Sequence, residues 1–301
     1  MRILLFFFLA STAISLNAQK TDKKLQHQLE KLVTGFHGDI GIYVKDLRTG
    51  KTCSINADTI FPTASIVKVP IMIGIMDKVN KGELKFDQLF TYRDSLLYAG
   101  IDILGSFKQD EKISLDRLLM LMLTMSDNTA SLWLQSLAGT GSRINELMDS
   151  LGYANTRVNS RTPGREHLRT KYGWGQTTPK EMASIFERIS KGEIISRAAS
   201  DEMLRQLSRN HYDDEAISQV PPYVTVFSKN GAVNQSRSEV VLVVGKKAHY
   251  VFTIMTKNNV DQSWKDNNEA WVLTRKISKL LWEHYEPRDK WEPASGENIF
   301  N

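Results

Sequence analysis

The sequence is poor in residues that form disulfides or bind metals, with one cysteine, Cys53, and six scattered histidines among 301 residues. A lone cysteine cannot form an internal disulfide, and Cys53 is best interpreted as a small strand residue. No two histidines stand at the spacing of zinc ligands. We therefore expect neither a bound metal nor another cofactor.

Long runs of one charge are missing as well. The 39 Lys and Arg residues only slightly outnumber the 34 Asp and Glu residues, which gives a formal net charge of +5. Without a basic run or interleaved aromatic residues, nucleic acid is not an expected partner. No G-x-S-x-G segment occurs, which argues against an α/β-hydrolase. We expect a small-molecule substrate and a monomeric protein.

Residues 1–18 have the pattern of a secretory signal peptide. Arg2 precedes the apolar stretch "ILLFFFLA", and small residues end at Ala18, before Gln19. The apolar stretch is too short for a membrane anchor, so we expect cleavage near Ala18. No cysteine follows for a lipid anchor. The mature protein is expected to be periplasmic or secreted, without a stable membrane anchor.

Apolar periodicity predicts helices at both ends of the chain and through its middle. Helical patterns cover residues 22–34, 114–125, 130–139, 143–152, 178–190, 200–210 and 268–286. Alternating patterns predict a hairpin over 39–57 and strands over 223–229, 238–245 and 249–257. Strands at both ends of the chain must meet to build one sheet, which we expect to be antiparallel.

These patterns predict an α+β fold of the α/β-sandwich type. An antiparallel sheet of about five strands would be flanked by the N- and C-terminal helices, with an all-helical lobe inserted between the strands. We expect one domain over 19–301, with its sheet lobe at about 22–64 and 220–285, its helical lobe at 65–219 and a polar tail at 286–301. The cleft between the lobes is the natural place for a ligand.

One charged residue interrupts a very apolar predicted helix. In "FPTASIVKVPIMIGIM", residues 61–76, Lys68 follows Ser65 by three positions, so their side chains share a helix face. Burial lowers the pKa of an amine, and a neutral amine beside a hydroxyl is a general base for a nucleophile. The alternative is a lysine that reaches water from the end of the helix.

Two further motifs follow, and each has a plain alternative. Ser126-Asp127-Asn128 separates two predicted helices, where it could be an ordinary N-cap. Lys229-Asn230-Gly231 ends a predicted strand, where the glycine would let a ligand approach the backbone or would mark a simple turn. Lys171-Tyr172-Gly173 has the same Lys-x-Gly skeleton, so this last motif alone is not specific.

In this order, the three motifs resemble those of the penicillin-recognising serine enzymes, and in particular the class A β-lactamases. The resemblance covers about residues 22–285, including "TTPKEM" at 177–182. It implies a single catalytic domain. It also implies that Ser65 becomes acylated, that Lys68 takes the proton of Ser65, and that Ser126 passes a proton to the departing nitrogen.

The resemblance also implies the residues that bind substrate. Asn128 would hold the side-chain amide of the substrate and orient Lys68, and Lys229 would attract the substrate carboxylate. Gly231 would allow close approach, and the backbone N–H groups of Ser65 and Ala232 would form the oxyanion hole. Asp127 is expected to brace its loop.

The sequence departs from the class A pattern in the loop before "TTP", where the family carries a glutamate in an E-x-x-L-N pattern that releases the acyl group. Here Thr162 or Pro163 takes that place. Glu166 is the one acid of the loop, and it is either the displaced catalytic residue or a surface glutamate. Without this base, Ser65 can be acylated while release is slow.

A second departure lies on the predicted strands. Asn230 replaces the usual Thr or Ser, although an amide can still donate to a carboxylate. Arg237 follows closely and could either bind a substrate carboxylate or face solvent.

Three functions remain open at this point. The first is a serine hydrolase that opens β-lactam rings. The second is a D-alanyl-D-alanine peptidase or transpeptidase-like enzyme that acts on peptidoglycan. The third is a non-catalytic binder of cell-wall peptides. The intact set of two hydroxyls and two lysines, Ser65, Ser126, Lys68 and Lys229, argues against the binder.

Overall fold

The computed structural model describes residues 20–98, 100 and 102–293, so the predicted signal peptide lies outside the described residues. A five-stranded antiparallel sheet forms the centre, in the order β2-β1-β10-β9-β8. Its strands are β1 (Asp39–Asp46), β2 (Thr52–Ile55), β8 (Thr225–Val233), β9 (Ser236–Val244) and β10 (His249–Lys257). Strand β1 pairs with β10, which confirms that the two ends of the chain build one sheet.

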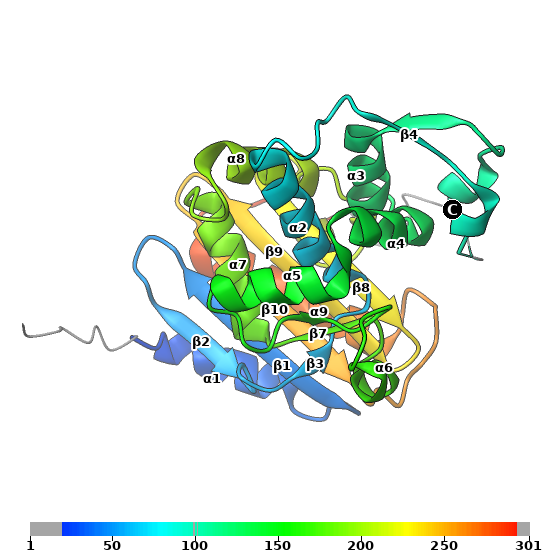
Figure 1. The fold of residues 1–301 in the computed structure, drawn as a ribbon. Helices are drawn as coiled ribbons and strands as arrows, with labels where there is room; N and C mark the ends of the chain where they lie inside the picture. The colour runs from blue at the N-terminus through cyan, green and yellow to red at the C-terminus, as the bar shows by residue number, and fades with distance from the viewer. Residues whose placement is uncertain (1–19, 99, 101, 294–301) are drawn as a thin grey trace, which may run out of the picture.

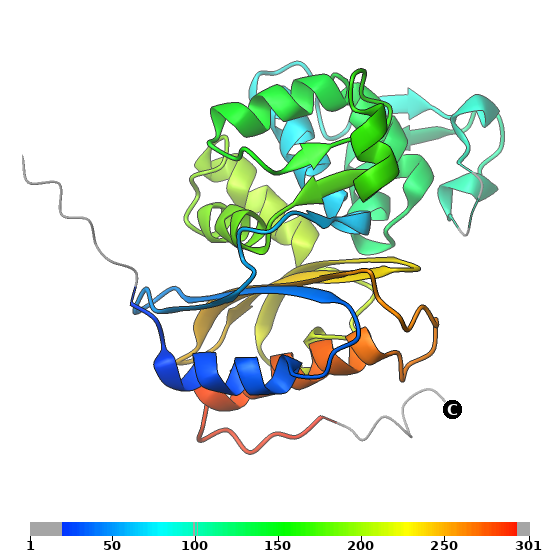
Figure 2. The ribbon, with the colours of Figure 1, turned by 90° about the horizontal axis from the view of Figure 1, so that it is seen from below.

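Helices from the two ends of the chain cover one face of the sheet (Figure 2). They are α1 (Lys23–Val33), capped by Asp22, and α9 (Glu269–Tyr285), capped by Asn268. Their apolar stripes pack with alternate residues of the strands into one buried cluster, which includes Leu25, Leu29, Ile42, Val241, Ile277 and Leu281. The sequence predicted both helices because this stripe has the helical period.

The opposite face of the sheet carries the helical layer (Figures 1 and 2). Its helices are α2 (Lys68–Asn80), α3 (Leu115–Thr124), α4 (Asn128–Leu137), α5 (Thr140–Ser150), α7 (Pro179–Ser190) and α8 (Arg197–Leu207). Helix α7 packs directly on β1, β9 and β10. Helix α2 is buried on all sides from Lys68 to Asp77, which explains its almost wholly apolar sequence.

Short elements that the sequence did not predict connect these layers. Strands β3 (Phe61–Pro62), β6 (Arg157–Val158) and β7 (Gly175–Thr177) form a small sheet, and β4 (Leu89–Thr91) pairs with β5 (Lys112–Ser114). Helix α6 spans Glu166–Tyr172. The 3₁₀ turns are η1 (Ala64–Val67), η2 (Asp94–Leu96), η3 (Leu104–Ser106) and η4 (Ile217–Gln219). The chain therefore enters the helical layer through β3 and η1.

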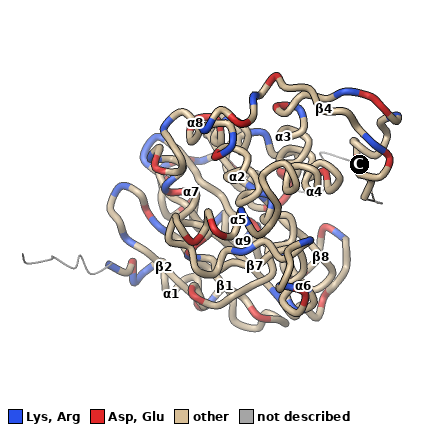
Figure 3. The backbone as a smooth tube through the Cα atoms, viewed as in Figure 1, with Lys and Arg blue, Asp and Glu red and all other residues tan. Residues whose placement is uncertain are grey.

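The surface carries both signs of charge, interspersed along the chain (Figure 3). Residues 286–293 of the predicted tail are attached to the body: Tyr223 donates to Asp289, and Lys279 donates to Glu292 over 2.7 Å. In the part of the chain that the structure describes, no helix has the length and apolar character needed to cross a membrane.

Gly41 marks a place where β1 and the helical layer approach closely. A Cβ atom there would lie 2.4 Å from the Phe61 ring and 2.8 Å from Pro179. We expect Gly41→Ala to lower the free energy of unfolding by roughly 1–3 kcal/mol, because an overpacked site forces its neighbours to move. Chemical denaturation measures the effect.

Gly105→Ala is the matched control for this prediction. An added Cβ at Gly105 meets only the end of the exposed Leu97 side chain, at 3.0 Å, and that side chain can move. Equal stability of the two variants would contradict the close packing inferred at Gly41.

Candidate active site

Ser65 lies in the 3₁₀ turn η1, immediately before Lys68 begins α2. The sequence predicted both residues on one helix, and the structure places the serine in the tighter turn ahead of it. The preceding residue, Ala64, has a φ of +43°, a left-handed conformation that is unfavourable for alanine. Strain of this kind persists only where the surrounding structure enforces it, and it clusters at functional sites.

Lys68 is completely buried, with 0% of its surface exposed. Its Nζ atom lies 2.9 Å from Ser65 Oγ, 2.9 Å from Ser126 Oγ, 3.0 Å from Asn128 Oδ1 and 2.5 Å from the Ser126 carbonyl oxygen. The structure therefore brings three other predicted site residues, Ser65, Ser126 and Asn128, around the amine of Lys68.

The hydrogen-bond partners of Lys68 can accommodate a neutral amine. A charged lysine has three N–H donors and no acceptor, whereas four oxygens surround Nζ. The Ser126 carbonyl and the Asn128 amide oxygen can only accept. A neutral amine satisfies these two with its two N–H groups and leaves its lone pair for a hydroxyl proton of Ser65 or Ser126.

Burial and a neighbouring charge favour the neutral form of Lys68. Burial lowers the pKa of Lys68 well below its ordinary value, and the nearby charge of Lys229 lowers it further. The carboxylates of Asp102 and Asp127 oppose this shift. Lys68 is therefore suited to accept a proton from a hydroxyl.

The loop that carries Ser126 is held from two sides. Asp127 is buried and accepts from the backbone N–H of Ala130 (2.7 Å) and of Leu104 (2.8 Å), so it both caps α4 and braces the loop, as predicted. Asp102, which the sequence did not single out, accepts from the N–H groups of Asn128 (3.1 Å) and Thr129 (3.0 Å). These carboxylates fix the position of Asn128 at the N-terminus of α4.

Lys229 forms a second buried amine at the site. Strand β8 continues to Val233, so Lys229-Asn230-Gly231 lies inside the strand and not at its end as predicted. Burial lowers the pKa of Lys229 to about 7, and Glu239 opposes this shift. Lys229 Nζ donates to the backbone oxygen of Asn230 (3.0 Å) and to its side-chain oxygen (2.9 Å), which leaves the Asn230 NH₂ group as a donor.

Gly231 is the point at which β8 contacts η1. A Cβ atom there would lie 2.6 Å from the Thr63 carbonyl oxygen and 2.7 Å from the Ser65 backbone nitrogen. Only glycine permits this approach, which places the next residue, Ala232, beside Ser65 at the wall of a cavity.

This cavity has a volume of about 490 Å³, a size suited to a small-molecule ligand. Its walls come from η1, α4, the α6–β7 segment, the β8–β9 turn and the end of β10; they comprise Pro62, Ala64, Ser65, Tyr98, Asn128, Lys171, Tyr172, Gly173, Trp174, Ala232, Val233, Gln235, Ser236, Lys257 and Asn258. No Asp or Glu of the described chain is among them. Tyr98 and Trp174 meet edge to face, with ring centroids 5.1 Å apart.

Several of these residues were missed by sequence reasoning. Lys171-Tyr172-Gly173, which counted only as a copy of the Lys-x-Gly skeleton, forms part of the wall. Tyr98, Trp174 and Lys257 carry no motif, and only the folding of distant loops brings them together. No signal in a single sequence identifies them.

The structure does not bring Glu166 to the other predicted catalytic residues. It lies on the exposed first turn of α6, and its carboxylate accepts from the N–H of Gly164 at 3.1 Å. It does not line the cavity at Ser65. The loop is folded so that this carboxylate closes a local turn on the surface.

The positions aligned with the family glutamate also lie away from the cavity. Thr162 is buried and donates to the Ser160 carbonyl oxygen, and a Cβ at Gly141 would lie 1.8 Å from its Oγ1 atom. Thr162 therefore packs against α5, while Pro163 is exposed.

Arg237 takes neither of the two positions that the sequence left open, at a substrate carboxylate or facing solvent. Only 2% of its surface is exposed, and its guanidinium lies against the rings of Trp264 and Trp271, at 4.5 and 4.6 Å from their centroids. It donates to the Ser236 and Ser263 carbonyl oxygens. Arg237 is a buried packing residue because cation–π contacts and backbone acceptors replace its solvent.

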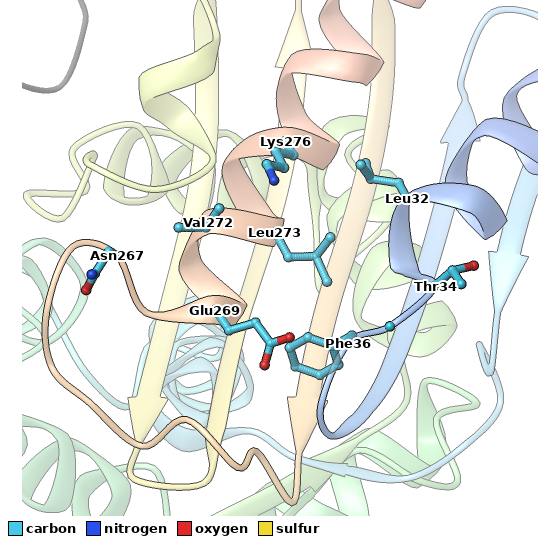
Figure 4. A pocket seen from close by; sticks show the side chains of 9 residues that line it. Leu32, Thr34, Phe36, Asn267, Glu269, Val272, Leu273 and Lys276 are labelled. Atoms are coloured by element: carbon cyan, nitrogen blue, oxygen red, sulfur yellow. The ribbon is translucent and has the colours of Figure 1, made fainter.

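A second cavity, of about 360 Å³, lies between α1 and α9 (Figure 4). Leu32, Phe36 and Leu273 line it, and the carboxylate of Glu269 at its edge contacts His37 Nδ1 at 2.9 Å. It lies on the opposite side of the sheet from Ser65. Within residues 20–98, 100 and 102–293, no group of three or more His, Cys, Asp or Glu side chains could hold a metal ion.

The fold and site together place a serine hydroxyl, a buried lysine amine and a second hydroxyl within hydrogen-bond distance beside the central sheet. The sequence pattern of the Beta-lactamase enzyme family matches residues 24–285. The protein belongs to this family of serine β-lactamases and penicillin-recognising enzymes.

Individual relatives are distant but match along most of their length. β-Lactamase VEB-1 of Pseudomonas aeruginosa is 19% identical over 294 residues, which cover 94% of this chain and 97% of that protein. An imipenem-hydrolyzing β-lactamase of Enterobacter cloacae is 24% identical over 270 residues, with coverage of 86% and 89%.

Solved structures share the fold. PBP-A is 23% identical with a TM-score of 0.79, and the alignment covers 89% of this chain and 98% of PBP-A. A PBP-A variant was solved as an acyl-enzyme complex with penicillin G and gives a TM-score of 0.80, with coverage of 90% and 100%. A β-lactamase from Sphaerobacter thermophilus, 21% identical, gives a TM-score of 0.76, with coverage of 88% and 97%.

The buried carboxyl group of Glu239 makes stability depend on pH. Burial raises the pKa of Glu239 to about 8 from 4.5. Between these values the folded protein retains a proton that the unfolded chain has lost, so stability falls as pH rises. We expect Glu239→Gln to reduce this slope between pH 5 and 7 by up to about 1.4 kcal/mol per pH unit.

Urea denaturation at several pH values measures the slope. Burial also raises the pKa of Glu215 to about 8, so the Glu239→Gln variant should retain part of the dependence of its unfolding free energy on pH. Glu193→Gln, at an exposed carboxyl group, is the matched control. An unchanged slope in Glu239→Gln would show that this group is ionised in the folded protein.

Proposed function

We propose that this protein is a serine hydrolase that opens β-lactam rings by forming an acyl-enzyme at Ser65 and that releases the acyl group slowly. The observation that carries the proposal is the buried Lys68 amine, 2.9 Å from both Ser65 Oγ and Ser126 Oγ. The reaction is of the kind captured in the PBP-A variant with penicillin G.

In the first half of the proposed reaction, neutral Lys68 takes the proton of Ser65 while Oγ attacks the lactam carbonyl carbon. The carbonyl oxygen becomes an oxyanion, which the backbone N–H groups of Ser65 and Ala232 stabilise. Each such donor is commonly worth about 3 kcal/mol in the transition state. Asn128 orients Lys68 and holds the side-chain amide of the substrate.

In the second half, the carbon–nitrogen bond breaks and the ring nitrogen takes the hydroxyl proton of Ser126. Ser126 regains a proton from Lys68, so the proton lost by Ser65 ends on the departing nitrogen. Lys229, charged below a pKa of about 7, attracts the substrate carboxylate, with Asn230 as an additional donor. The product is an ester on Ser65.

Hydrolysis of this ester needs a base that activates water. No carboxylate among the described residues lines the cavity, and Glu166 lies on the surface of α6. The absence of a carboxylate from the wall supports slow release. It also supports the second candidate, a D-alanyl-D-alanine peptidase or transpeptidase-like enzyme, which does not need the loop glutamate.

Export to the periplasm or medium belongs to the same proposal and rests on residues 1–18 of the sequence. A cell-wall or β-lactam substrate is met in that compartment. We further propose that the protein acts as a monomer without a membrane anchor.

The first test is the reaction with benzylpenicillin and with a chromogenic cephalosporin. We expect an adduct on Ser65 by intact mass and a burst of about one equivalent of colour, followed by slow turnover. Ser65→Ala should show neither. Fast continuous turnover would contradict slow release, and the absence of an adduct with no turnover would contradict the enzyme.

Glu166→Ala isolates the contribution of the loop acid. Because its carboxylate closes a surface turn, we expect release of the acyl group at the rate of the unmodified protein. A release rate at least tenfold below that of the unmodified protein would show that Glu166 takes part in releasing the acyl group. The same adduct, followed by mass over time, gives the rate.

The pH profile of acylation tests the two amines separately. The second-order rate constant should rise as Lys68 loses its proton and fall above pH about 7 as Lys229 loses its charge. Lys229→Arg keeps a positive charge at all working pH values, so we expect its falling limb to move to higher pH. Lys24→Arg, on exposed α1, is the control, and an unmoved limb in Lys229→Arg would exclude Lys229 as the titrating group.

A further inference from the structure

The cavity beside Ser65 covers only one side of the bond that breaks in the proposed reaction. Asn128 and Ala232 line it, whereas Ser126 and Lys229, assigned to the departing nitrogen and the substrate carboxylate, do not. The cavity therefore receives the acyl half of the substrate, including its side chain. This inference rests on the proposed function.

Two lysines without carboxylate partners line this part of the site. Lys257, at the end of β10, is half-buried; its Nζ donates to the Ile60 carbonyl oxygen at 3.0 Å and lies 4.8 Å from the Phe61 ring centroid. Lys171, in the last turn of α6, is exposed. Neither forms an ion pair with any described residue, whereas Lys45 and Lys180 each bind a carboxylate.

The cross-strand carboxylate does not neutralise Lys257. Asp39 lies opposite Lys257 in the β1–β10 ladder, but its Oδ2 atom accepts from Asn258 Nδ2 at 2.8 Å. Lys257 therefore retains donors for a ligand. With no acid among the cavity's described lining residues, the wall has a positive potential.

Ser236 supplies an independent observation that points to a ligand. Its side chain is 1% exposed and lines the cavity, yet its Oγ atom has no hydrogen-bond partner among the described residues. Ser238 and Met255 form the last pair of the β9–β10 ladder at this end, and Ser236 and Lys257, each two residues beyond that pair on its own strand, both line the cavity. A buried hydroxyl without a partner is costly, so a ligand atom is the natural acceptor.

We propose that Lys257, Ser236 and Lys171 form an anion subsite that selects acyl donors with a negatively charged side chain. Lys257 and Ser236 donate to the side-chain carboxylate of the ligand, and Lys171 approaches it from α6 across the cavity. Charge-assisted hydrogen bonds of this kind are stronger than neutral ones. The expected substrates are β-lactams with an anionic side chain or acidic peptides.

Two penicillins that differ only in one carboxylate test the subsite. Benzylpenicillin has a neutral side chain, and α-carboxybenzylpenicillin has the same side chain with a carboxylate. We expect the ratio of acylation rate constants, charged over neutral, to fall about three- to tenfold in Lys257→Gln and about threefold in Ser236→Ala. Lys171→Gln should have a smaller effect because this lysine is exposed.

Lys24→Gln on α1 removes the same charge on the far side of the sheet and should leave the ratio unchanged. Raising the salt concentration should lower the ratio in the unmodified protein and have little effect in Lys257→Gln, because salt screens the subsite charge. A ratio that Lys257→Gln and Ser236→Ala both leave unchanged would overturn the proposal.

A binding measurement separates this inference from the proposed function. Ser65→Ala cannot be acylated, and calorimetry on it compares the affinity for the two penicillins without chemistry. Tighter binding of the carboxylated penicillin, lost in Ser65→Ala with Lys257→Gln, supports the subsite even if Ser65 proves unreactive. Equal affinity for both penicillins would overturn the subsite even if Ser65 forms its adduct.

Discussion

The site depends on one buried amine. Lys68 exposes none of its surface, and withdrawing an ammonium from water costs several kcal/mol unless it is paired or loses its proton. No carboxylate in the described chain forms an ion pair with it; two hydroxyls and two pure acceptors surround it instead. Burial and the nearby charge of Lys229 favour the neutral form, which is the form that can take a proton from Ser65.

The surrounding fold holds the four oxygens around Lys68 Nζ in place. Ser65 comes from η1, while Ser126 and Asn128 come from a loop that Asp127 and Asp102 fasten to α4. Strand β8 reaches η1 only because Gly231 has no side chain, and β8 is held in the sheet by strands from the C-terminal part of the chain. The geometry at Lys68 therefore requires the two ends and the middle of the chain to fold together.

The sequence predicts the regular parts of this arrangement well. The stripes of α1 and α9, the hairpin β1–β2 and strands β8 to β10 have clear periods, and the order of three motifs indicated Ser65, Lys68, Ser126 and Lys229. The residues that line the cavity at Ser65 could not be predicted from sequence periods or motifs. Trp174 and Lys257 reach the cavity through long-range packing, and Arg237 is buried because Trp264 and Trp271, far along the chain, enclose it.

The α6 loop connects the two proposed properties of the site. Where the family carries a glutamate, this chain has Thr162, which packs against α5, or the exposed Pro163, and the following segment contributes Lys171 and Trp174 to the cavity wall. A wall without a carboxylate has no carboxylate base to take a proton from water, which is why we propose that the ester on Ser65 persists. The same wall, left with uncompensated lysines, attracts an anionic acyl donor. The two proposed properties, slow release and preference for negative side chains, thus share one feature, a cavity wall without a carboxylate, to which α6 contributes Lys171 while β9 and β10 contribute Ser236 and Lys257.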